Sequence, residues 1–413
     1  MRLTAPVSLL QRHIGSPFPV HALTSIRLIN SKITKTNINI NNAPYSSSPS
    51  PPFNPDTYLT SARQRMISQT PTTIRDILSP TPSHLLTLSL ADHIPSLFPP
   101  DILSLPFLPS LHSHSQKQQQ PPAASAPPLP QGYHLVYFPL QLPPSQLMPD
   151  GTDPAHWPGA PFERRMWAGG EVIFHEGWDQ ALRLDGRGVK CVEKVGYSES
   201  GEAGEGVVVK GGRGEEKVFV DVRRGYGVEE GGTAVEEVRR LVFMRSRGEG
   251  EGVVVGRAVR APATPEFTFS LTPDATLLFH FSALTYNAHA IHLDPDYARR
   301  REGYRGLLVH GPLSLLLMLT AVRTCLAKVS SSSSLPYSST NQDKQTTTAA
   351  GPAAYVKSLS YRNISPLYVG EKMTVCVKRK TNSVQPGQLG WDVWIEGPEG
   401  GLAVKGSAVT TAA

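Results

Sequence analysis

The chain has 413 residues, of which 40 are Lys or Arg and 34 are Asp or Glu, so its formal net charge is +6. An apolar content of 39% excludes a wholly disordered chain, while 38 Pro and 35 Gly indicate a folded body interrupted by irregular stretches. The basic surplus is typical of nucleic-acid-binding proteins, but residues 1–55 hold five basic residues and no acid, which leaves 35 basic and 34 acidic residues in the rest. This near-neutral body excludes the basic surface by which proteins bind nucleic acid, so no nucleic-acid partner is expected.

Residues 1–55 are predicted to be a mitochondrial presequence and a linker. The segment is rich in Arg, Ser, Thr and Asn, lacks acids and carries apolar residues at short intervals, as presequences do. A secretory signal needs an unbroken apolar region, and the stretch from Leu3 to Leu10 is interrupted; a plain disordered tail is the alternative. Three dispersed cysteines without a Cys-x-x-Cys pair fit a reducing compartment. We therefore expect localisation in the mitochondrial matrix.

Residues 56–262 are expected to form the first of two domains. Residues 56–94 carry helical signals, with Thr72 and Thr73 predicted to cap a helix. From about residue 95 to 130 the composition shifts to Pro, Ser and Gln, which predicts a flexible insertion. Alternating β-branched runs separated by Gly-rich turns then predict an antiparallel sheet, with strands over 171–175, 190–195, 217–222 and 235–244.

Residues 263–413 are expected to form the second domain. A short strand over 267–270 precedes a helix over 275–285, in which apolar residues recur at spacings of three and four. The apolar helix predicted from Pro312 to about Lys328 is interrupted by polar residues, so we expect it to be buried in a soluble domain and not to span a membrane. A Ser/Thr-rich insertion is predicted over 330–348, and the last strands over 354–361, 373–380, 391–396 and 403–409.

The apolar helix in the second half indicates the fold. A helix with no polar face must be covered on all sides, and a strongly curved antiparallel sheet wrapped around it does this. That arrangement is the hotdog architecture. Two sheet-forming halves therefore predict an α+β double hotdog, two antiparallel sheets each wrapped around a central helix. The halves would pair within one chain as an internal pseudo-dimer, and further oligomerisation is left open.

Two stretches of the second half carry chemistry. They are Phe281-Ser-Ala-Leu-Thr-Tyr-Asn-Ala-His-Ala-Ile-His-Leu-Asp-Pro-Asp-Tyr-Ala298 and Tyr304-Arg-Gly-Leu-Leu-Val-His-Gly-Pro-Leu313. They resemble the motif of the MaoC-like hotdog hydratases and dehydratases, and in particular the subgroup of fungal mitochondrial hydroxyacyl-thioester dehydratases type 2 and mesaconyl-CoA hydratase-like proteins. Pro161 to Gly170 is similar to the upstream half of this subgroup. The resemblance covers roughly residues 130–245 and 265–410.

The resemblance implies site residues. Asn287 falls where the family has its catalytic Asp, His289 where it has Asn, and His292 where it has the catalytic His. Gly311 follows His310 in the pair that opens the family's central helix, and its backbone N–H is the expected donor to the thioester oxygen. An amide is no general base, so we expect His292 to transfer the proton and Asn287 to orient the leaving hydroxyl or a water.

Other polar residues of these stretches have weaker assignments. Tyr286, His289 and His310 are expected to contact substrate, although His289 is equally a support for its loop and His310 is more readily structural. Asp294 is expected to cap a short helix over 296–300. Reading His289, His292 and Asp294 as zinc or iron ligands is a minor alternative, because no distant further ligand is evident. We expect neither a metal nor a redox cofactor.

Three functions follow from the resemblance. The first is a (3R)-3-hydroxyacyl-thioester dehydratase, a hydro-lyase that forms trans-2-enoyl thioesters on acyl carrier protein in mitochondrial fatty acid synthesis. The second is the same chemistry on a short CoA ester of the mesaconyl or itaconyl type. The third is a non-catalytic acyl-thioester-binding protein. Arg299 to Arg301 would suit an acidic carrier protein or CoA phosphates alike, and the leucines from Leu313 to Leu319 are either core packing or the lining of an acyl tunnel.

Overall fold

The computed structural model describes residues 53–100, 102–103, 126–196, 206–212, 214–247, 259–261, 263–333, 354–381 and 385–411. From Phe53 onward the chain forms one compact unit. The predicted leader and most of the insertions predicted at 95–130 and 330–348 lie outside the described residues.

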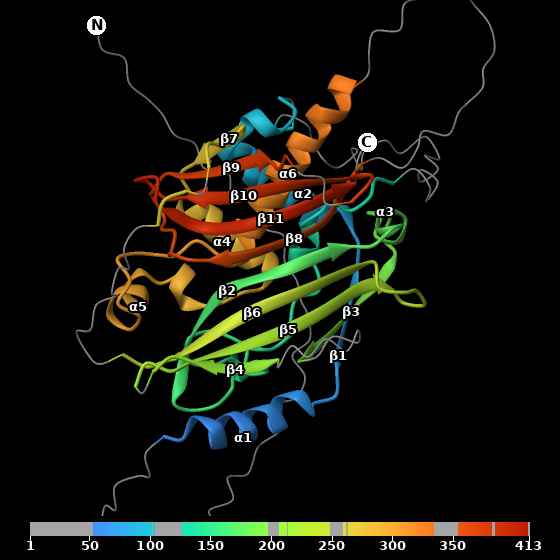
Figure 1. Cartoon of the computed structure of the whole chain (residues 1–413). Helices are drawn as coiled ribbons and strands as arrows, with labels where there is room; N and C mark the ends of the chain where they lie inside the picture. Colours follow the sequence, from blue (N-terminus) through green and yellow to red (C-terminus); the bar gives the residue numbers. More distant parts are fainter. Residues whose placement is uncertain are drawn as a thin grey trace, which may run out of the picture. The chain divides into compact units, whose positions relative to one another are not determined.

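In the described part of the chain, eleven strands form one antiparallel sheet, in the order β1-β3-β5-β6-β2-β8-β11-β10-β9-β7 with β4 beside β5 (Figure 1). The pairing of β2 with β8 joins the two halves. The first half contains β1 (Thr72–Ile77), β2 (Phe162–Phe174), β3 (Gly188–Val195), β4 (Val207–Lys210), β5 (Lys217–Val228) and β6 (Val235–Arg245). The second half contains β7 (Phe267–Leu271), β8 (Val356–Asn363), β9 (Met373–Arg379), β10 (Gln388–Glu396) and β11 (Leu402–Thr411).

The helices agree with the predictions in the second half, and in the first half two helices lie in the predicted helical range of 56–94 with one correction between them. The helix predicted at 275–285 is confirmed, and the Asp294 carboxylate caps the short helix that follows. The helix predicted to begin at Thr72 and Thr73 is wrong: those residues start β1, because the β-branched run pairs with β3 and this pairing overrides the local signal. The helices are α1 (Pro55–Ile67), α2 (Pro80–His93), α3 (Trp178–Ala181), α4 (Ala275–Thr285), α5 (Pro295–Arg300) and α6 (Gly311–Ser333), with 3-10 turns η1 (Pro95–Leu97), η3 (Tyr133–Val136), η4 (Pro144–Gln146) and η5 (Ala290–His292).

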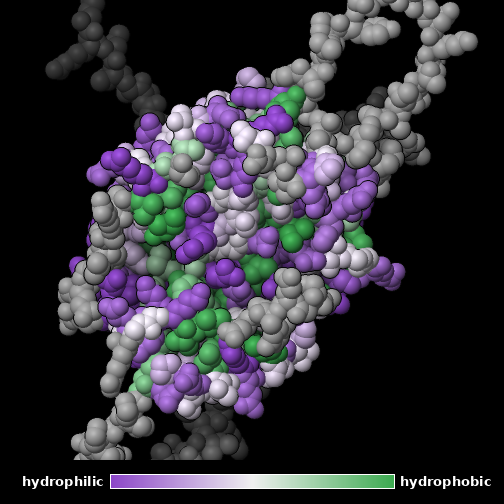
Figure 2. Space-filling model, viewed as in Figure 1, coloured by the Kyte–Doolittle hydropathy of each residue, from purple (hydrophilic) through white to green (hydrophobic). Residues whose placement is uncertain are grey.

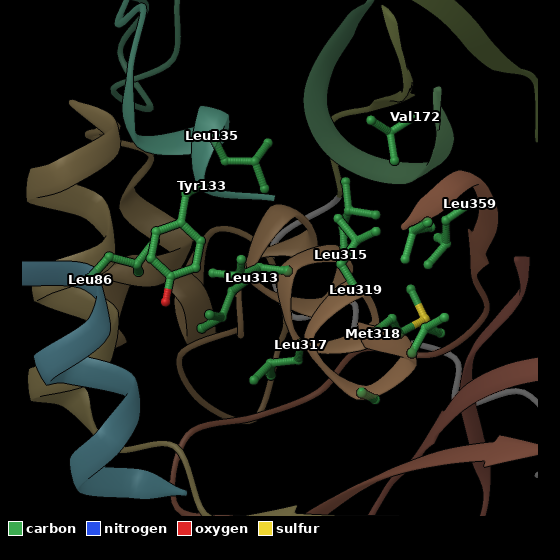
Figure 3. Packing of buried hydrophobic residues seen from close by; sticks show 14 of the residues in the cluster. Leu86, Tyr133, Leu135, Val172, Leu313, Leu315, Leu317, Met318, Leu319 and Leu359 are labelled. Atoms are coloured by element: carbon green, nitrogen blue, oxygen red, sulfur yellow. The ribbon is translucent and has the colours of Figure 1, made fainter. Parts of the chain in front are cut away.

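Helix α6 is the predicted central helix of the second half, a few residues longer than expected. Its length and hydropathy from Gly311 to Val329 would suit a membrane span, but 67% of that segment is buried inside the protein. Figure 3 shows its side chains between Leu86 and Tyr133 on one side and Val172 and Leu359 of the sheet on the other. Leu313, Leu315, Leu316, Leu317, Met318 and Leu319 are all 0% exposed. A helix apolar on nearly all faces is thus covered all round, which confirms the hotdog fold.

The interior of the first half is filled differently from that of the second half. Within the described ranges, no long helix comparable to α6 lies against its sheet. Met66 of α1 packs on Val218 and Val220 at one end, and η3 with α2 covers the other end. On the face drawn in Figure 2, hydrophobic residues form separate patches among hydrophilic ones. The double hotdog is therefore one continuous sheet with two unlike interiors.

The join between the halves creates an opening. β2 pairs with β8 only from Gly169 to Ile173, so the earlier part of β2 has no β8 partner. A bulge between Trp167 and Gly169 marks the point of separation. Gly169 has φ +146°, and a Cβ there would lie 2.3 Å from the carbonyl oxygen of Tyr361, so only glycine fits. Residues 287–311 cover the unpaired edge and bring the predicted site residues to it.

Candidate active site

His292 has the geometry of a neutral base. Its Nδ1 lies 2.8 Å from the carbonyl oxygen of Leu308, and since a carbonyl only accepts, Nδ1 carries the proton. Nε2 then bears a lone pair, and no described residue hydrogen-bonds to it. Burial lowers the pKa of His292 to about 4, so the ring is neutral at physiological pH. His292 lines a cavity of about 1200 Å³ at the join of the two halves.

His310 lies behind His292 and does not line this cavity. The two rings stack, with centroids 3.7 Å apart and planes inclined by 21°. His310 is 0% exposed, and its Nε2 lies 2.9 Å from the Ser282 hydroxyl oxygen. Burial, reinforced by the neighbouring histidines, holds the pKa of His310 well below its usual range. Its position is that of a support for His292; the predicted contact with substrate stays a prediction.

Gly311 begins α6 directly against β2. A Cβ at this position would lie 2.7 Å from Cβ and Cγ of Trp167, so glycine is required for the strand to pack on the helix terminus. Trp167 is fixed in turn because its Nε1–H donates to the Tyr361 hydroxyl at 2.6 Å. Gly311 lines the cavity, and no acceptor for its N–H is found among the described residues. This N–H, at the positive end of a 23-residue helix, is available to an oxygen in the cavity.

Asn287 and Tyr286 close the end of α4. Tyr286 adopts the left-handed conformation with φ 52°, and the N–H of Asn287 donates to the carbonyl of Ser282 at 2.8 Å. The side-chain oxygen of Asn287 accepts from the N–H of His289 at 3.0 Å, which leaves its NH₂ group for the cavity. Both residues line the cavity, and Tyr286 is exposed. The structure therefore gathers Asn287, Tyr286, His289, His292 and Gly311 on one cavity.

His289 faces a carboxylate that the sequence did not reveal. Asp150 Oδ2 lies 3.6 Å from His289 Nε2, just beyond hydrogen-bond length, and both side chains are buried. The other oxygen of Asp150 accepts from Thr152 N–H at 2.9 Å and from its hydroxyl at 2.6 Å. Burial, together with His292 and Arg165, lowers the pKa of His289 well below its usual value.

The turn that carries Asp150 is clamped to the histidine loop. The carbonyl oxygen of Asp150 accepts from Ala290 N–H at 2.8 Å. Gly151 has φ +80°, and a Cβ there would lie 2.0 Å from the carbonyl oxygen of Ala288. The polar turn can be recognised in the sequence, but no local pattern predicts that it contacts a loop of the second half.

A row of buried charges forms the cavity wall in the first half; we call it the charged belt. Its members lie on β2, β3, β5, β6 and the segment before β2, and the register of these strands places them side by side. The sequence predicts none of them, because pairing between segments remote in the chain leaves no local signal. The belt consists of Asp153, His156, Arg165, Glu193, Arg224, Glu237 and Arg239.

The belt alternates in charge. Arg165 lies 3.2 Å from Asp153, whose other oxygen is 3.3 Å from His156 Nδ1. His156 Nε2 is 3.0 Å from Glu193, which is 3.1 Å from Arg224. Burial alone would lower the pKa of His156, but the two carboxylates raise it to about 9, so this histidine is charged.

Glu237 and Arg239 complete the belt. Arg239 Nη2 lies 2.9 Å from Glu237, which also accepts from the hydroxyl of Tyr226 and lies 3.8 Å from His134 Nε2. Burial opposes ionisation of Glu237, yet Arg239 beside it keeps the pKa of this carboxyl below its usual value. The belt is therefore a set of permanent charges, in contrast to the neutral histidines a short distance away.

The structure bears on three groups of residues that the sequence singled out. Helix α6 contributes only Gly311, Pro312 and Ser314 to the cavity lining, so its leucines are core and line no acyl tunnel there. Arg299 to Arg301 are exposed and do not line the cavity. Across the residues the structure describes, no group of three His, Cys, Asp or Glu side chains is arranged to hold a metal ion.

Comparisons with known proteins show the family to which the chain belongs. A family model described as hydroxyacyl-thioester dehydratase type 2 matches residues 132–369. The chain is 35% identical over 210 residues to mesaconyl-C(4)-CoA hydratase of Chloroflexus aurantiacus, covering 49% of this chain and 68% of that protein.

Two more distant similarities complete the comparison. The chain is 23% identical over 261 residues to the mitochondrial hydroxyacyl-thioester dehydratase type 2 of Schizosaccharomyces pombe, covering 61% of this chain and 78% of that protein. The crystal structure of a MaoC-like dehydratase from Phytophthora capsici superposes with a TM-score of 0.46 at 14% identity, covering 85% of this chain and 99% of that one.

Proposed function

Because the chain belongs to the hydroxyacyl-thioester dehydratase type 2 family and is a hydro-lyase, we propose that it interconverts (3R)-3-hydroxyacyl thioesters and trans-2-enoyl thioesters. The observation that carries this proposal is the pairing of a neutral, oriented base with a free N–H at a helix terminus. His292 presents Nε2, and Gly311 presents its N–H, on the same cavity.

Dehydration begins at the thioester. The carbonyl oxygen accepts from Gly311 N–H, and the positive end of α6 stabilises the negative charge that develops on that oxygen. His292 Nε2 then removes the C2 proton, and the electron pair of the C2–H bond forms the C2–C3 double bond as the C3–O bond breaks. The imidazolium returns its proton to the departing hydroxyl, which leaves as water. A pKa of about 4 makes the protonated ring a ready donor for this last step.

Asn287 and His289 hold the hydroxyl or the water. The NH₂ group of Asn287 donates, as expected from its place in the motif, and takes no part in proton transfer. Asp150 favours the proton of His289 on Nε2, which leaves Nδ1 to accept from the hydroxyl or the water. Asp150 is thus a positioning residue that acts through His289. Asp150, a carboxylate of the first half, therefore partly replaces the family's catalytic Asp, whose position is occupied by Asn287 in this chain.

A hydration assay tests the reaction. Purified chain is mixed with crotonyl thioesters of CoA and of acyl carrier protein, and loss of the enoyl absorbance is followed. We expect turnover with at least one carrier, and a fall in kcat of about 10²- to 10⁴-fold for His292→Ala with the fold retained by circular dichroism. His280→Ala is the matched control, because His280 is exposed and lies outside the cavity. No turnover by folded protein with either carrier would favour the acyl-thioester-binding function instead.

The carrier and the pathway are part of the proposal. Acyl carrier protein in mitochondrial fatty acid synthesis, and hence the matrix, is supported by the presequence-like composition of residues 1–55 and by the mitochondrial relative of Schizosaccharomyces pombe. A short CoA ester is the second candidate, favoured by the 35% identity to mesaconyl-C(4)-CoA hydratase. The ratio of kcat/KM for the two crotonyl carriers decides between them.

A further inference from the structure

Ser282 is a serine of α4 whose hydroxyl is directed away from its own helix. The residue is buried and lines the cavity. A serine or threonine inside a helix commonly donates to the carbonyl four residues earlier, as Thr285 of the same helix does to Phe281 at 2.7 Å. The Ser282 hydroxyl oxygen instead lies 2.9 Å from His310 Nε2, and it has no other partner in the described part of the chain. Its hydrogen bonding is therefore not used up by the backbone.

The position of the proton on His310 decides the direction of this hydrogen bond. The ring is 0% exposed and neutral, because burial holds its pKa well below the usual range, so one of its two nitrogens carries a proton. Among the described residues, Nδ1 has no hydrogen-bond partner. Buried N–H groups without an acceptor are rarer in proteins than buried acceptors without a donor. The proton is therefore on Nε2, and His310 donates it to the hydroxyl oxygen of Ser282.

The Ser282 hydroxyl then has its own proton to donate. A hydroxyl accepts through its oxygen and donates through its single hydrogen, and here the oxygen accepts from His310. Since no described acceptor takes the hydrogen and the side chain lines the cavity, this donor is available to an oxygen inside the cavity. The pair is not arranged as a nucleophile and its base, because His310 Nε2 already carries a proton. Ser282 is thus a fixed hydrogen-bond donor.

The neighbours of Ser282 indicate which oxygen it meets. The N–H of Asn287 donates to the carbonyl of Ser282 at 2.8 Å, so these two residues adjoin at the end of α4. The ring of His310, which holds the Ser282 hydroxyl, stacks on His292 with centroids 3.7 Å apart. Ser282 is therefore beside both the proposed base and the proposed donor to the hydroxyl. The oxygen that concerns both of those residues is the one that C3 loses or gains.

Resting on the proposed hydratase function, we propose that Ser282 is a further catalytic residue whose hydroxyl donates to the C3 oxygen of the substrate, and that His310 positions it. In dehydration the C3–O bond breaks and its electron pair stays on the oxygen. The hydrogen bond from Ser282 stabilises that charge until the proton from His292 arrives. In hydration the same bond orients the attacking water, which passes a proton to His292. Ser282 keeps its own proton throughout.

Kinetics of crotonyl hydration give the first measurement. Ser282→Ala should lower kcat by about 10- to 100-fold, the effect of one hydrogen bond to a developing charge. KM should stay within about threefold, because the crotonyl group has no C3 oxygen for Ser282 to bind. Thr285→Ala is the matched control: its hydroxyl is on the same helix and the residue lines the same cavity, but it donates to the carbonyl of Phe281. This variant should keep the kcat of the wild type.

Binding measures the contact without turnover. The His292→Ala chain is titrated by calorimetry with (3R)-3-hydroxybutyryl-CoA and with butyryl-CoA, which differ only in the C3 hydroxyl. Adding Ser282→Ala should weaken the hydroxy ester by about fivefold and leave butyryl-CoA within about twofold, as for one neutral hydrogen bond. Ser282→Cys fills the same space with a weak donor and replaces Ser282→Ala if that variant is unfolded by circular dichroism.

The outcomes separate this inference from the hydratase proposal. An active wild type whose kcat is unchanged by Ser282→Ala overturns the role of Ser282 and leaves the reaction standing. An equal loss of affinity for both esters, or no selective loss, including no measurable binding of either, also overturns it. Failure of the crotonyl assay together with a selective loss for the hydroxy ester would instead overturn the reaction and leave the contact standing.

Discussion

The interiors of the two halves show two ways of filling the same curved sheet. In the second half, α6 satisfies its own backbone hydrogen bonds and fills the interior with leucines that are 0% exposed. In the first half no such helix is described, and the middle of the sheet is covered by charged side chains that pair with one another. The proposed active site lies where these interiors meet.

His156 in the first half and His292 in the second respond to burial in opposite ways. His292 has no carboxylate beside it, so burial lowers its pKa to about 4. His156 is buried between two carboxylates, which raise its pKa to about 9. Burial alone therefore does not decide the charge of a histidine; the groups enclosed with it do. A histidine that transfers protons needs an environment like that of His292, and a histidine that must stay charged needs one like that of His156.

The largest expected effect tests whether the charged belt stabilises the first half as α6 stabilises the second. Glu193→Gln breaks a buried pair with His156 and Arg224, and should lower the free energy of unfolding by about 3–5 kcal/mol. Glu236→Gln on β6 is the control, because Glu236 forms an exposed pair with His175 whose loss costs about 0–1 kcal/mol. Urea denaturation measures both. Equal stabilities would mean that the belt does not hold the first half together.

The next effect concerns the contact between the halves. Gly311→Ala places a methyl group against Trp167 and displaces the N–H that serves the thioester oxygen, so kcat should fall by about 10²- to 10³-fold. Gly306→Ala is the control, because a Cβ there meets nothing within 4 Å. Unchanged turnover in Gly311→Ala would remove the helix terminus from the mechanism.

A smaller effect is expected where the first half reaches into the histidine loop. Asp150→Asn keeps the shape of the turn but removes the charge that orients His289, so kcat should fall by about 10- to 100-fold with little change in KM. The pH profile of kcat should shift as well, because the tautomer of His289 is no longer fixed. A loss of stability without a change in the profile would make Asp150 structural only.

The smallest effects are in the dependence of stability on pH, with opposite signs for His156 in the first half and His292 in the second. The folded-state pKa of His156 is raised, so its contribution is complete below the unfolded pKa of about 6.5 and is lost as pH rises through about 9. The folded-state pKa of His292 is lowered, so the protein loses stability as pH falls from about 6.5 to about 4. Denaturation curves of His156→Gln should lack the alkaline limb, whereas those of His292→Gln should show a smaller acid limb, because the pKa values of His289 and His310 are also lowered. If both variants lost the same limb, the contrast between the halves would be wrong.

The local sequence pattern by itself determined much of the fold and of the proposed site in the second half. The spacing of apolar residues predicted α4, and the nearly all-apolar sequence of α6 predicted a covered central helix and hence the hotdog fold. The motif around His292 and Gly311 predicted the proposed base and oxygen donor, because both lie within one stretch of chain in which Leu308 orients His292 and Gly311 begins α6. Each of these features depends on neighbours in sequence, which periodicity and motif spacing report.

Only the tertiary structure determines which residues lie opposite that motif. Thr72 and Thr73 became strand because β3 lies beside them. Asp150 meets His289 through a turn clamped across the two halves, and Glu193, Arg224 and Glu237 align because the register of three strands places them in one row. Charge pairing of this kind depends on distances between segments remote in the chain. Composition and periodicity indicate which residues are buried, but not which charged group lies beside each of them.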